Sequence, residues 1–130
     1  MYNAYNNCMN LRVGICGPNV NICKSAYYDC PNLTHLYIEN PSMYNYGFTN
    51  LCHLTDNNQR KQRCLKIYAP TNSNTLTSLL IPRNEVLSPL VYTSYDWVYQ
   101  ESADGSSYYQ MADSFGVYNI RLYPVENVVA

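Results

Sequence analysis

The chain has 130 residues, the length of about one domain, and can bury roughly two-thirds of the surface of its unfolded form. Its net charge is −1 and only 13% of its residues are charged, so bulk electrostatics excludes recruitment of nucleic acid or a membrane surface. No segment approaches the roughly 18 uninterrupted apolar residues of a membrane span, and no secretion signal leads the chain, so we expect a soluble protein without membrane insertion.

Residues 1–11, 23–33 and 43–54 are three versions of one repeat. Their final leucines, Leu11, Leu33 and Leu54, are 22 and 21 residues apart, inside the period of about 20–29 residues found in leucine-rich repeats. Within a unit the phrase Ala-Tyr-x-x-Cys-x-x-Leu places apolar residues at i, i+1, i+4 and i+7. This spacing predicts a short helical turn with one inward stripe.

A short strand is predicted after each helical turn. Leu36 and Ile38 alternate with polar or outward residues before Pro41 stops the run. Because one strand with one turn cannot bury its apolar stripe alone, the units are expected to stack. The predicted repeat core comprises Ala4, Cys8, Leu11, Cys23, Ala26, Cys30, Leu33, Leu36, Ile38, Leu51 and Leu54.

The repeats resemble the leucine-rich repeats of the BspA type, whose units read approximately Ala-Phe-x-x-Cys-x-x-Leu-x-x-Ile-x-Ile-Pro. The second unit carries the fullest match, with Ala26, Tyr27, Cys30, Leu33, Leu36 and Ile38. The resemblance implies an α/β fold, a short leucine-rich-repeat solenoid with one strand and one short helical turn per repeat. With the Cys-Gly-Pro-Asn-Val stretch at residues 16–20 and the abundant Tyr and Asn, the chain looks more like such repeats from gut bacteria and their phages than like plant or animal receptors.

Residues 55–63 contain no apolar residue and are predicted to form a polar loop projecting from the stack. Arg60, Lys61 and Arg63 are candidates for contact with a phosphate or an acidic partner, and a merely solvated loop is the alternative. Residues 64–70 read as the next strand, so the repeats occupy residues 1–70. Residues 71–130 are predicted to be a C-terminal β-rich cap over the open end of the solenoid.

The six cysteines fall largely into repeat positions that also accept Leu or Met. Cys8 and Cys30 share one position with Leu51, and Cys23 shares another with Met1. This exchange predicts free thiols that fill the core, with a disulfide as the alternative. No metal is expected, because the chain has no CxxC pair and its two histidines stand alone.

The fifteen tyrosines exceed what a core of this size needs. Tyr together with Asn is typical of adaptable recognition surfaces, although the codon usage of an AT-rich genome is the alternative explanation. The candidate interaction surface comprises Tyr28, Tyr37, Tyr44, Tyr46, Arg60, Lys61, Arg63, Tyr108 and Tyr109.

No catalytic motif is present: the chain lacks GxSxG, a P-loop and HExxH. Asp96, Glu101, Asp104 and Asp113 flank Trp97, but a glycan-cleaving enzyme needs two carboxylates roughly 5–10 Å apart in a cleft. Their Ser- and Gly-rich context favours solvated turns. We therefore expect no enzymatic activity and no cofactor.

The first repeat begins in mid-pattern, which predicts an uncapped N-terminal face. We expect this face to bind a protein partner or a second copy of the chain, with a surface glycan as a further candidate partner. The resemblance implies a structural or host-attachment component of a phage virion. The alternative is the ligand-binding end of an adhesin at the bacterial cell surface, as part of a longer secreted chain.

Overall fold

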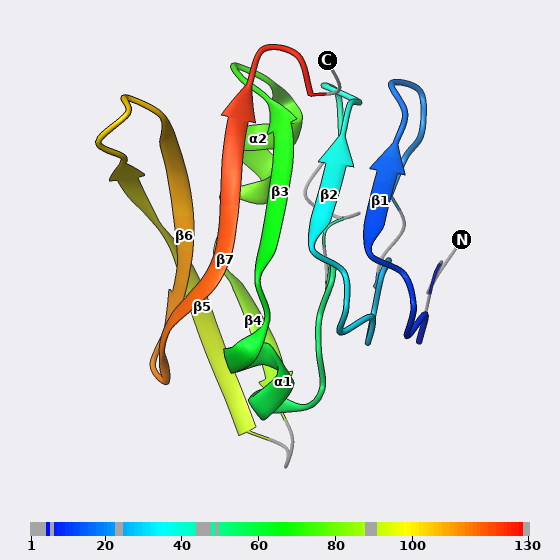
Figure 1. Cartoon of the computed structure of the whole chain (residues 1–130), viewed down its shortest axis with the longest axis vertical. Coiled ribbons are helices and arrows are strands. Elements are labelled where there is room, and N and C mark those ends of the chain that lie inside the picture. Colours follow the sequence, from blue (N-terminus) through cyan, green and yellow to red (C-terminus); the bar gives the residue numbers. More distant parts are fainter. Residues whose placement is uncertain are drawn as a thin grey trace.

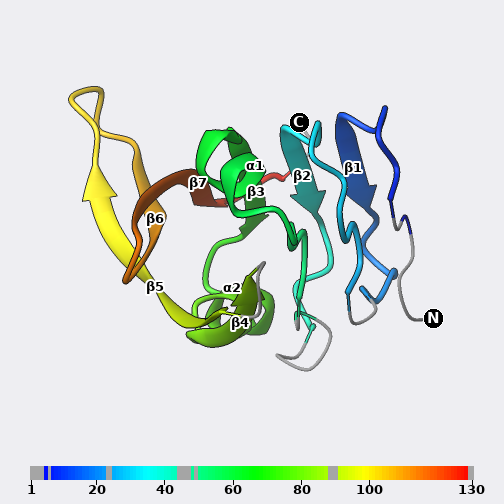
Figure 2. The same ribbon diagram turned by 90° about the horizontal axis from the view of Figure 1, so that it is seen from below.

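The computed structural model describes residues 5, 7–22, 25–43, 48, 50–87 and 91–128. They form one seven-stranded sheet in the order β1-β2-β3-β7-β6-β5-β4, accompanied by two short helices (Figure 1). The elements are β1 (Val13–Cys16), β2 (His35–Ile38), α1 (Asn57–Gln62), β3 (Leu65–Pro70), α2 (Asn74–Leu79), β4 (Arg83–Leu87), β5 (Val91–Glu101), β6 (Ser107–Asp113) and β7 (Gly116–Val125). The sheet curls into a half-barrel, as seen from below in Figure 2.

The predicted leucine-rich-repeat solenoid is wrong. In a solenoid each unit contacts only its neighbours in sequence, whereas here Leu65 on β3 pairs with Ile120 on β7. Strands β1, β2, β3 and β7 are parallel, and β7, β6, β5 and β4 are antiparallel. Short turns join β5 to β6 and β6 to β7, which forces antiparallel neighbours. Residues 71–130 thus contribute four strands to the same sheet that holds the repeat strands.

The expected helical turn within each repeat is interrupted at one shared position. Asn7, Asp29 and Asn50 occupy the same repeat position and have φ angles of 56°, 53° and 56°. These values lie in the left-handed region, which Asn and Asp tolerate best among residues with a side chain. A right-handed helix cannot continue through such a residue, so the helical pattern is broken at this position in all three repeats. In the third repeat Phe48, two residues earlier, is in a 3₁₀ conformation.

Equivalent turns lie against one another through backbone and ring contacts. Asp29 N donates to His53 O at 2.8 Å, linking the second turn to the third. Tyr5 and Tyr27 stack with ring centroids 5.1 Å apart and planes inclined by 6°. The repeated sequence therefore produces a repeated local geometry, although the whole chain is not a solenoid.

The hydrophobic core lies on the concave side of the sheet. Alternate residues of the central strands are buried there, for example Leu36 on β2, Ile67 on β3 and Leu122 on β7, and Leu79 of α2 packs against them. Of the predicted repeat core, six residues are buried, namely Ala26, Cys30, Leu33, Leu36, Ile38 and Leu54. Cys8, Leu11 and Leu51 are partly buried against this cluster. Ala4 and Cys23 lie outside the described residues.

Helix α1 forms within the stretch expected to be a projecting loop. The Asp56 carboxylate caps it by accepting from Asn58 N at 2.9 Å and Gln59 N at 3.2 Å. Arg60 and Arg63, expected on the surface, are only 2% and 6% exposed. Because residues 55–63 contain no apolar side chain, the aliphatic stems of Arg60 and Arg63 provide the inward packing of this segment.

Candidate interaction surface

A row of tyrosines crosses the convex face of the sheet. Parallel pairing places Tyr37 on β2 beside Tyr68 on β3, and Tyr68 beside Tyr123 on β7. Their ring centroids are 4.9 and 5.2 Å apart, with planes inclined by 8° and 18°. Tyr108 on β6 extends the row, 5.5 Å from Tyr123 and tilted by 41°. These four residues, Tyr37, Tyr68, Tyr123 and Tyr108, are called the tyrosine row below.

Stacking determines what the tyrosine row offers to a ligand. Because the rings of its three parallel members face one another, a ligand above the sheet meets their edges and hydroxyl groups. Burial raises the pKa of Tyr68, and the neighbouring Tyr37 and Tyr123 raise it further. The hydroxyl of Tyr68 therefore stays protonated at neutral pH and can act as a hydrogen-bond donor.

Two cations lie next to the tyrosine row on the same face. Lys66 on β3 and Arg121 on β7 are paired residues in the sheet, two positions before Tyr68 and Tyr123 respectively. Arg121 Cζ lies 4.5 Å from the ring centroid of Tyr108, and its Nη1 donates to Tyr123 Oη at 3.5 Å. Neither cation has a carboxylate partner within the described part of the chain. Their positive charges are therefore available to an anion.

The outer edge of β1 is open. Arg12 O and Cys16 O accept hydrogen bonds from the β2 side at 2.8 Å. Because alternate residues of a strand bond to opposite neighbours, the backbone groups of Val13 and Ile15 point away from β2. Within the described residues no strand pairs with this edge. The side chains of Val13 and Ile15 are 47% and 60% exposed, so the edge is apolar as well as unpaired.

The surface residues predicted from sequence are scattered in the structure. Tyr37 and Tyr108 belong to the tyrosine row, whereas Tyr109 lies on the opposite face, edge-on to Tyr99 at 5.4 Å. Tyr28 is half-buried against His53. Lys61 is exposed on α1, and Arg60 and Arg63 are buried. Tyr44 and Tyr46 lie outside the described residues.

Tyr68 and Tyr123 are members of the row that are not among the surface residues predicted from sequence. Both lie at alternating strand positions, Lys66-Ile-Tyr68 and Arg121-Leu-Tyr123. The shared pattern of a cation, an aliphatic residue and a tyrosine is the signal that links them. It becomes informative only when β3 and β7 are known to be neighbours.

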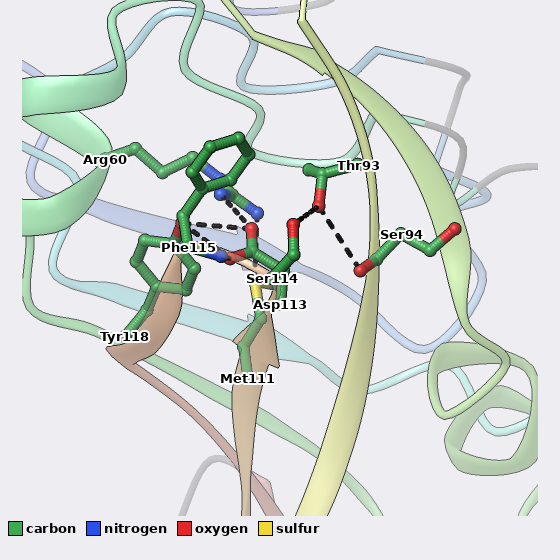
Figure 3. A network of polar contacts seen from close by, with 8 residues as sticks. All are labelled: Arg60, Thr93, Ser94, Met111, Asp113, Ser114, Phe115 and Tyr118. Atoms are coloured by element: carbon green, nitrogen blue, oxygen red, sulfur yellow. Dashed lines mark hydrogen bonds and ion pairs between the residues drawn. The ribbon is translucent and has the colours of Figure 1, made fainter.

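A buried ion pair fastens α1 to the sheet (Figure 3). Arg60 Nη1 lies 2.6 Å from Asp113 Oδ2, and the two side chains are 3% and 0% exposed. Asp113 also accepts from Tyr118 Oη at 2.9 Å and from Phe115 N at 2.8 Å. Arg60 Cζ lies 4.2 Å from the centroid of the Tyr118 ring. The carboxylate is thus held by donors from α1, β7 and the turn after β6, which is a structural role.

Arg63 also has a structural role, because its guanidinium binds backbone carbonyls of the repeat turns. Its Nη1 donates to Cys52 O at 2.6 Å, and its Nη2 donates to Cys30 O at 3.3 Å. A third carbonyl, Leu33 O, lies 3.5 Å from Nη2. One guanidinium therefore satisfies buried backbone acceptors from two successive repeats.

The cavity beside Trp97 does not bring the candidate acids together. It measures about 30 Å³, room for about one water molecule, and its lining includes Phe48, Trp97 and Met111 but no carboxylate within the described residues. Asp104 instead accepts from Ser106 in the turn between β5 and β6. These hydrogen bonds lower the pKa of Asp104, as expected for a solvated turn aspartate.

The five described cysteines are free thiols. Burial raises the pKa of Cys52 to about 12 and also raises the pKa values of Cys16 and Cys30. Within the described residues no three His, Cys, Asp or Glu side chains are placed to hold a metal ion.

The buried thiols predict a loss of stability in alkali. Above the ordinary thiol pKa of 9.0 the unfolded chain loses the Cys52 proton while the folded chain keeps it, so the free energy of unfolding falls as pH rises from about 9 towards 12. The maximal slope is about 1.4 kcal/mol per pH unit for one thiol. In urea unfolding between about pH 8 and 10.5, Cys52→Ala should show a shallower decline than the unsubstituted protein. The exposed Cys64→Ala is the control for removing a thiol, and equal slopes for Cys52→Ala and the unsubstituted protein would refute the prediction.

Comparisons with protein-family models, curated proteins and solved structures found no match. No helix in the described residues has the length and apolar character needed to cross a membrane.

Proposed function

We propose that this chain is a non-enzymatic protein-interaction module that associates by adding a strand to the open edge of β1. The observation that carries the proposal is the outward direction of the Val13 and Ile15 backbone groups, combined with the exposure of both side chains. Strand addition supplies main-chain hydrogen bonds for affinity and side-chain contacts for specificity.

The β1 edge lacks the features that normally protect a sheet edge. Natural edge strands carry charges, proline or bulges that prevent association, but Val13–Cys16 contains none of these. The opposite edge, β4, begins with Arg83 and includes Glu85. The two edges of the same sheet therefore differ in the way expected if only the β1 edge binds a partner.

The partner that best fits this edge is a second copy of the chain. Two β1 strands related by a twofold axis pair antiparallel, with Val13 of each copy opposite Ile15 of the other. Such pairing satisfies the outward backbone groups of both copies and covers four apolar side chains. Tyr5, Met9 and Val20, which are exposed in the same N-terminal region, add apolar surface that association would cover.

The biological setting is proposed from the sequence resemblance. A module of this kind suits a structural or host-attachment component of a phage virion, where many copies associate. The ligand-binding end of a bacterial surface adhesin is the second candidate, favoured by the same resemblance. Incorporation into particles and binding to intact bacterial cells are the measurements that separate the two settings.

The oligomeric state tests the proposal. Light scattering should give twice the chain mass of 15.0 kDa for the unsubstituted protein. Ile15→Lys should give the monomer mass, because a lysine on the edge disfavours strand pairing. Val117→Lys is the matched control, since Val117 is a 70% exposed strand residue away from this edge, and it should remain dimeric. A monomeric unsubstituted protein, or a dimeric Ile15→Lys variant, would contradict pairing between two β1 strands.

A further inference from the structure

We infer that the convex face of the sheet binds an acidic polysaccharide, a chain of uronic acids lying across the strands over the tyrosine row and the cations Lys66 and Arg121. This site lies on a face of the sheet, whereas the proposed association uses its β1 edge. Ligand binding at the face and association at the edge are therefore tested by separate measurements.

The hydroxyl and cationic donors of this face lie in two neighbouring rows. Lys66 and Arg121 form one row across β3 and β7, and Tyr68 with Tyr123 continues the second row two residues further along the same strands. Two residues of a strand span about 7 Å, and adjacent strands are about 4.8 Å apart. Hydroxyl donors thus repeat at a short interval beside a line of positive charge. A polymer whose repeating units carry both hydroxyl and carboxylate groups matches both rows.

The charge of this face is complementary to an anion. The outward-facing positions within β2, β3 and β7 carry no carboxylate, and the carboxylates Glu39 and Glu126 lie just beyond the ends of β2 and β7, beside Pro70. Arg121 Nε is buried without an acceptor among the described residues, and the guanidinium lies over the Tyr108 ring and donates to the Tyr123 hydroxyl. The whole chain has a net charge of −1, so the charge of this positive region is opposite in sign to the net charge of the protein. Uncompensated cations on an open face favour an acidic ligand over a neutral one.

The geometry of the tyrosine rings favours a polysaccharide over single-stranded nucleic acid as the ligand. Proteins bind unpaired bases by stacking them on exposed aromatic faces. In the tyrosine row both faces of Tyr68 are covered, one by Tyr37 and one by Tyr123, and each of these two has one face covered by Tyr68, with planes inclined by 18° or less. The stacked interior of the row therefore offers no free face to a base or to a sugar ring. Recognition by hydroxyl and cation donors remains, and this is the chemistry that a uronic acid chain accepts.

Binding of oligogalacturonate, measured by calorimetry at low ionic strength, tests the inference. Tyr68→Phe keeps the stacked ring and removes only the hydroxyl, so it should weaken binding about threefold to tenfold, the equivalent of one hydrogen bond. The double variant Lys66→Gln with Arg121→Gln should weaken it by at least about tenfold, because both charged contacts are lost. Tyr99→Phe and Lys61→Gln, which change a tyrosine and a lysine outside this site, are the matched controls and should bind as the unsubstituted protein does.

Three results would overturn the inference. The first is no binding of oligogalacturonate to the unsubstituted protein. The second is equal binding of a neutral dextran oligosaccharide or tighter binding of an oligothymidylate. The third is unchanged affinity in both the Tyr68→Phe and the double variant. Ile15 pairs with Tyr37 on the same face, so Ile15→Lys is not used in this test. Binding of oligogalacturonate is instead measured at protein concentrations above and below that of dimer formation, and equal affinity per chain keeps the test independent of association.

Discussion

Replacing Asp113 with alanine is expected to lower the free energy of unfolding by about 3–5 kcal/mol, the usual effect of removing one partner from a buried ion pair. The substitution leaves the Arg60 side chain, which is 3% exposed, without its carboxylate. It also removes the acceptor of Tyr118 Oη and Phe115 N. Urea unfolding followed by circular dichroism gives the free energy directly.

A double-mutant cycle distinguishes loss of the pair from loss of packing. Arg60→Met combined with Asp113→Leu removes both charges, so it should cost less than the sum of the two single substitutions. Asp96→Ala is the matched control, because Asp96 is exposed on β5, and its effect should stay within about 0.5 kcal/mol. A loss below about 1 kcal/mol for Asp113→Ala would mean that the ion pair does not hold α1 to the sheet.

Replacing Arg63 with methionine is the second substitution with a large expected effect, about 2–4 kcal/mol of unfolding free energy. Methionine fills much of the same volume but donates no hydrogen bond. The carbonyls of Cys30 and Cys52 would then remain buried without the donors that Arg63 supplies, and each unsatisfied group costs about 1–3 kcal/mol. Chemical denaturation of the purified variant measures the loss.

The neighbouring Lys61→Met substitution is the control for Arg63→Met. Lys61 is exposed on the last turn of α1, so its replacement should change stability by no more than about 0.5 kcal/mol. Arg63→Lys should fall between the two, because a single ammonium cannot reproduce the forked geometry of the guanidinium. Equal effects of Arg63→Met and Lys61→Met would show that the repeat turns do not depend on Arg63.

Part of the fold was predictable because alternation is a local property. Leu36 and Ile38 marked β2, the run that ends at Pro70 marked β3, and the alternation between residues 115 and 124 marked β7. The turns were misjudged for an equally local reason. The i, i+1, i+4, i+7 spacing suits a helix, but the recurrent Asn7, Asp29 and Asn50 adopt left-handed backbone angles that end any helix.

The candidate site was only partly predictable. Tyr37 and Tyr108 were identified from the excess of tyrosine, but their relation to Tyr68 and Tyr123 depends on the pairing of β3 with β7. Arg60 was predicted to lie in a solvated loop or to contact a phosphate or an acidic partner. Its partner is Asp113, 53 residues away in the chain, and nothing in the local pattern of residues 55–63 distinguishes an inward arginine from an outward one.

The sequence by itself determined the local geometry of this protein: where its strands run, which side chains alternate, and which residues share a repeat position. These properties follow from neighbours within a few residues, where steric and hydrogen-bonding preferences act. Only the tertiary structure decided that β7 lies between β3 and β6, and hence that the fold is one curled mixed sheet. Strand order depends on contacts between residues more than fifty positions apart, such as Leu65 with Ile120. Local alternation does not choose the neighbour of a strand, because several apolar strands present similar faces for pairing. The same long-range pairing assembles the tyrosine row beside Lys66 and Arg121, so the candidate site exists only in the folded chain.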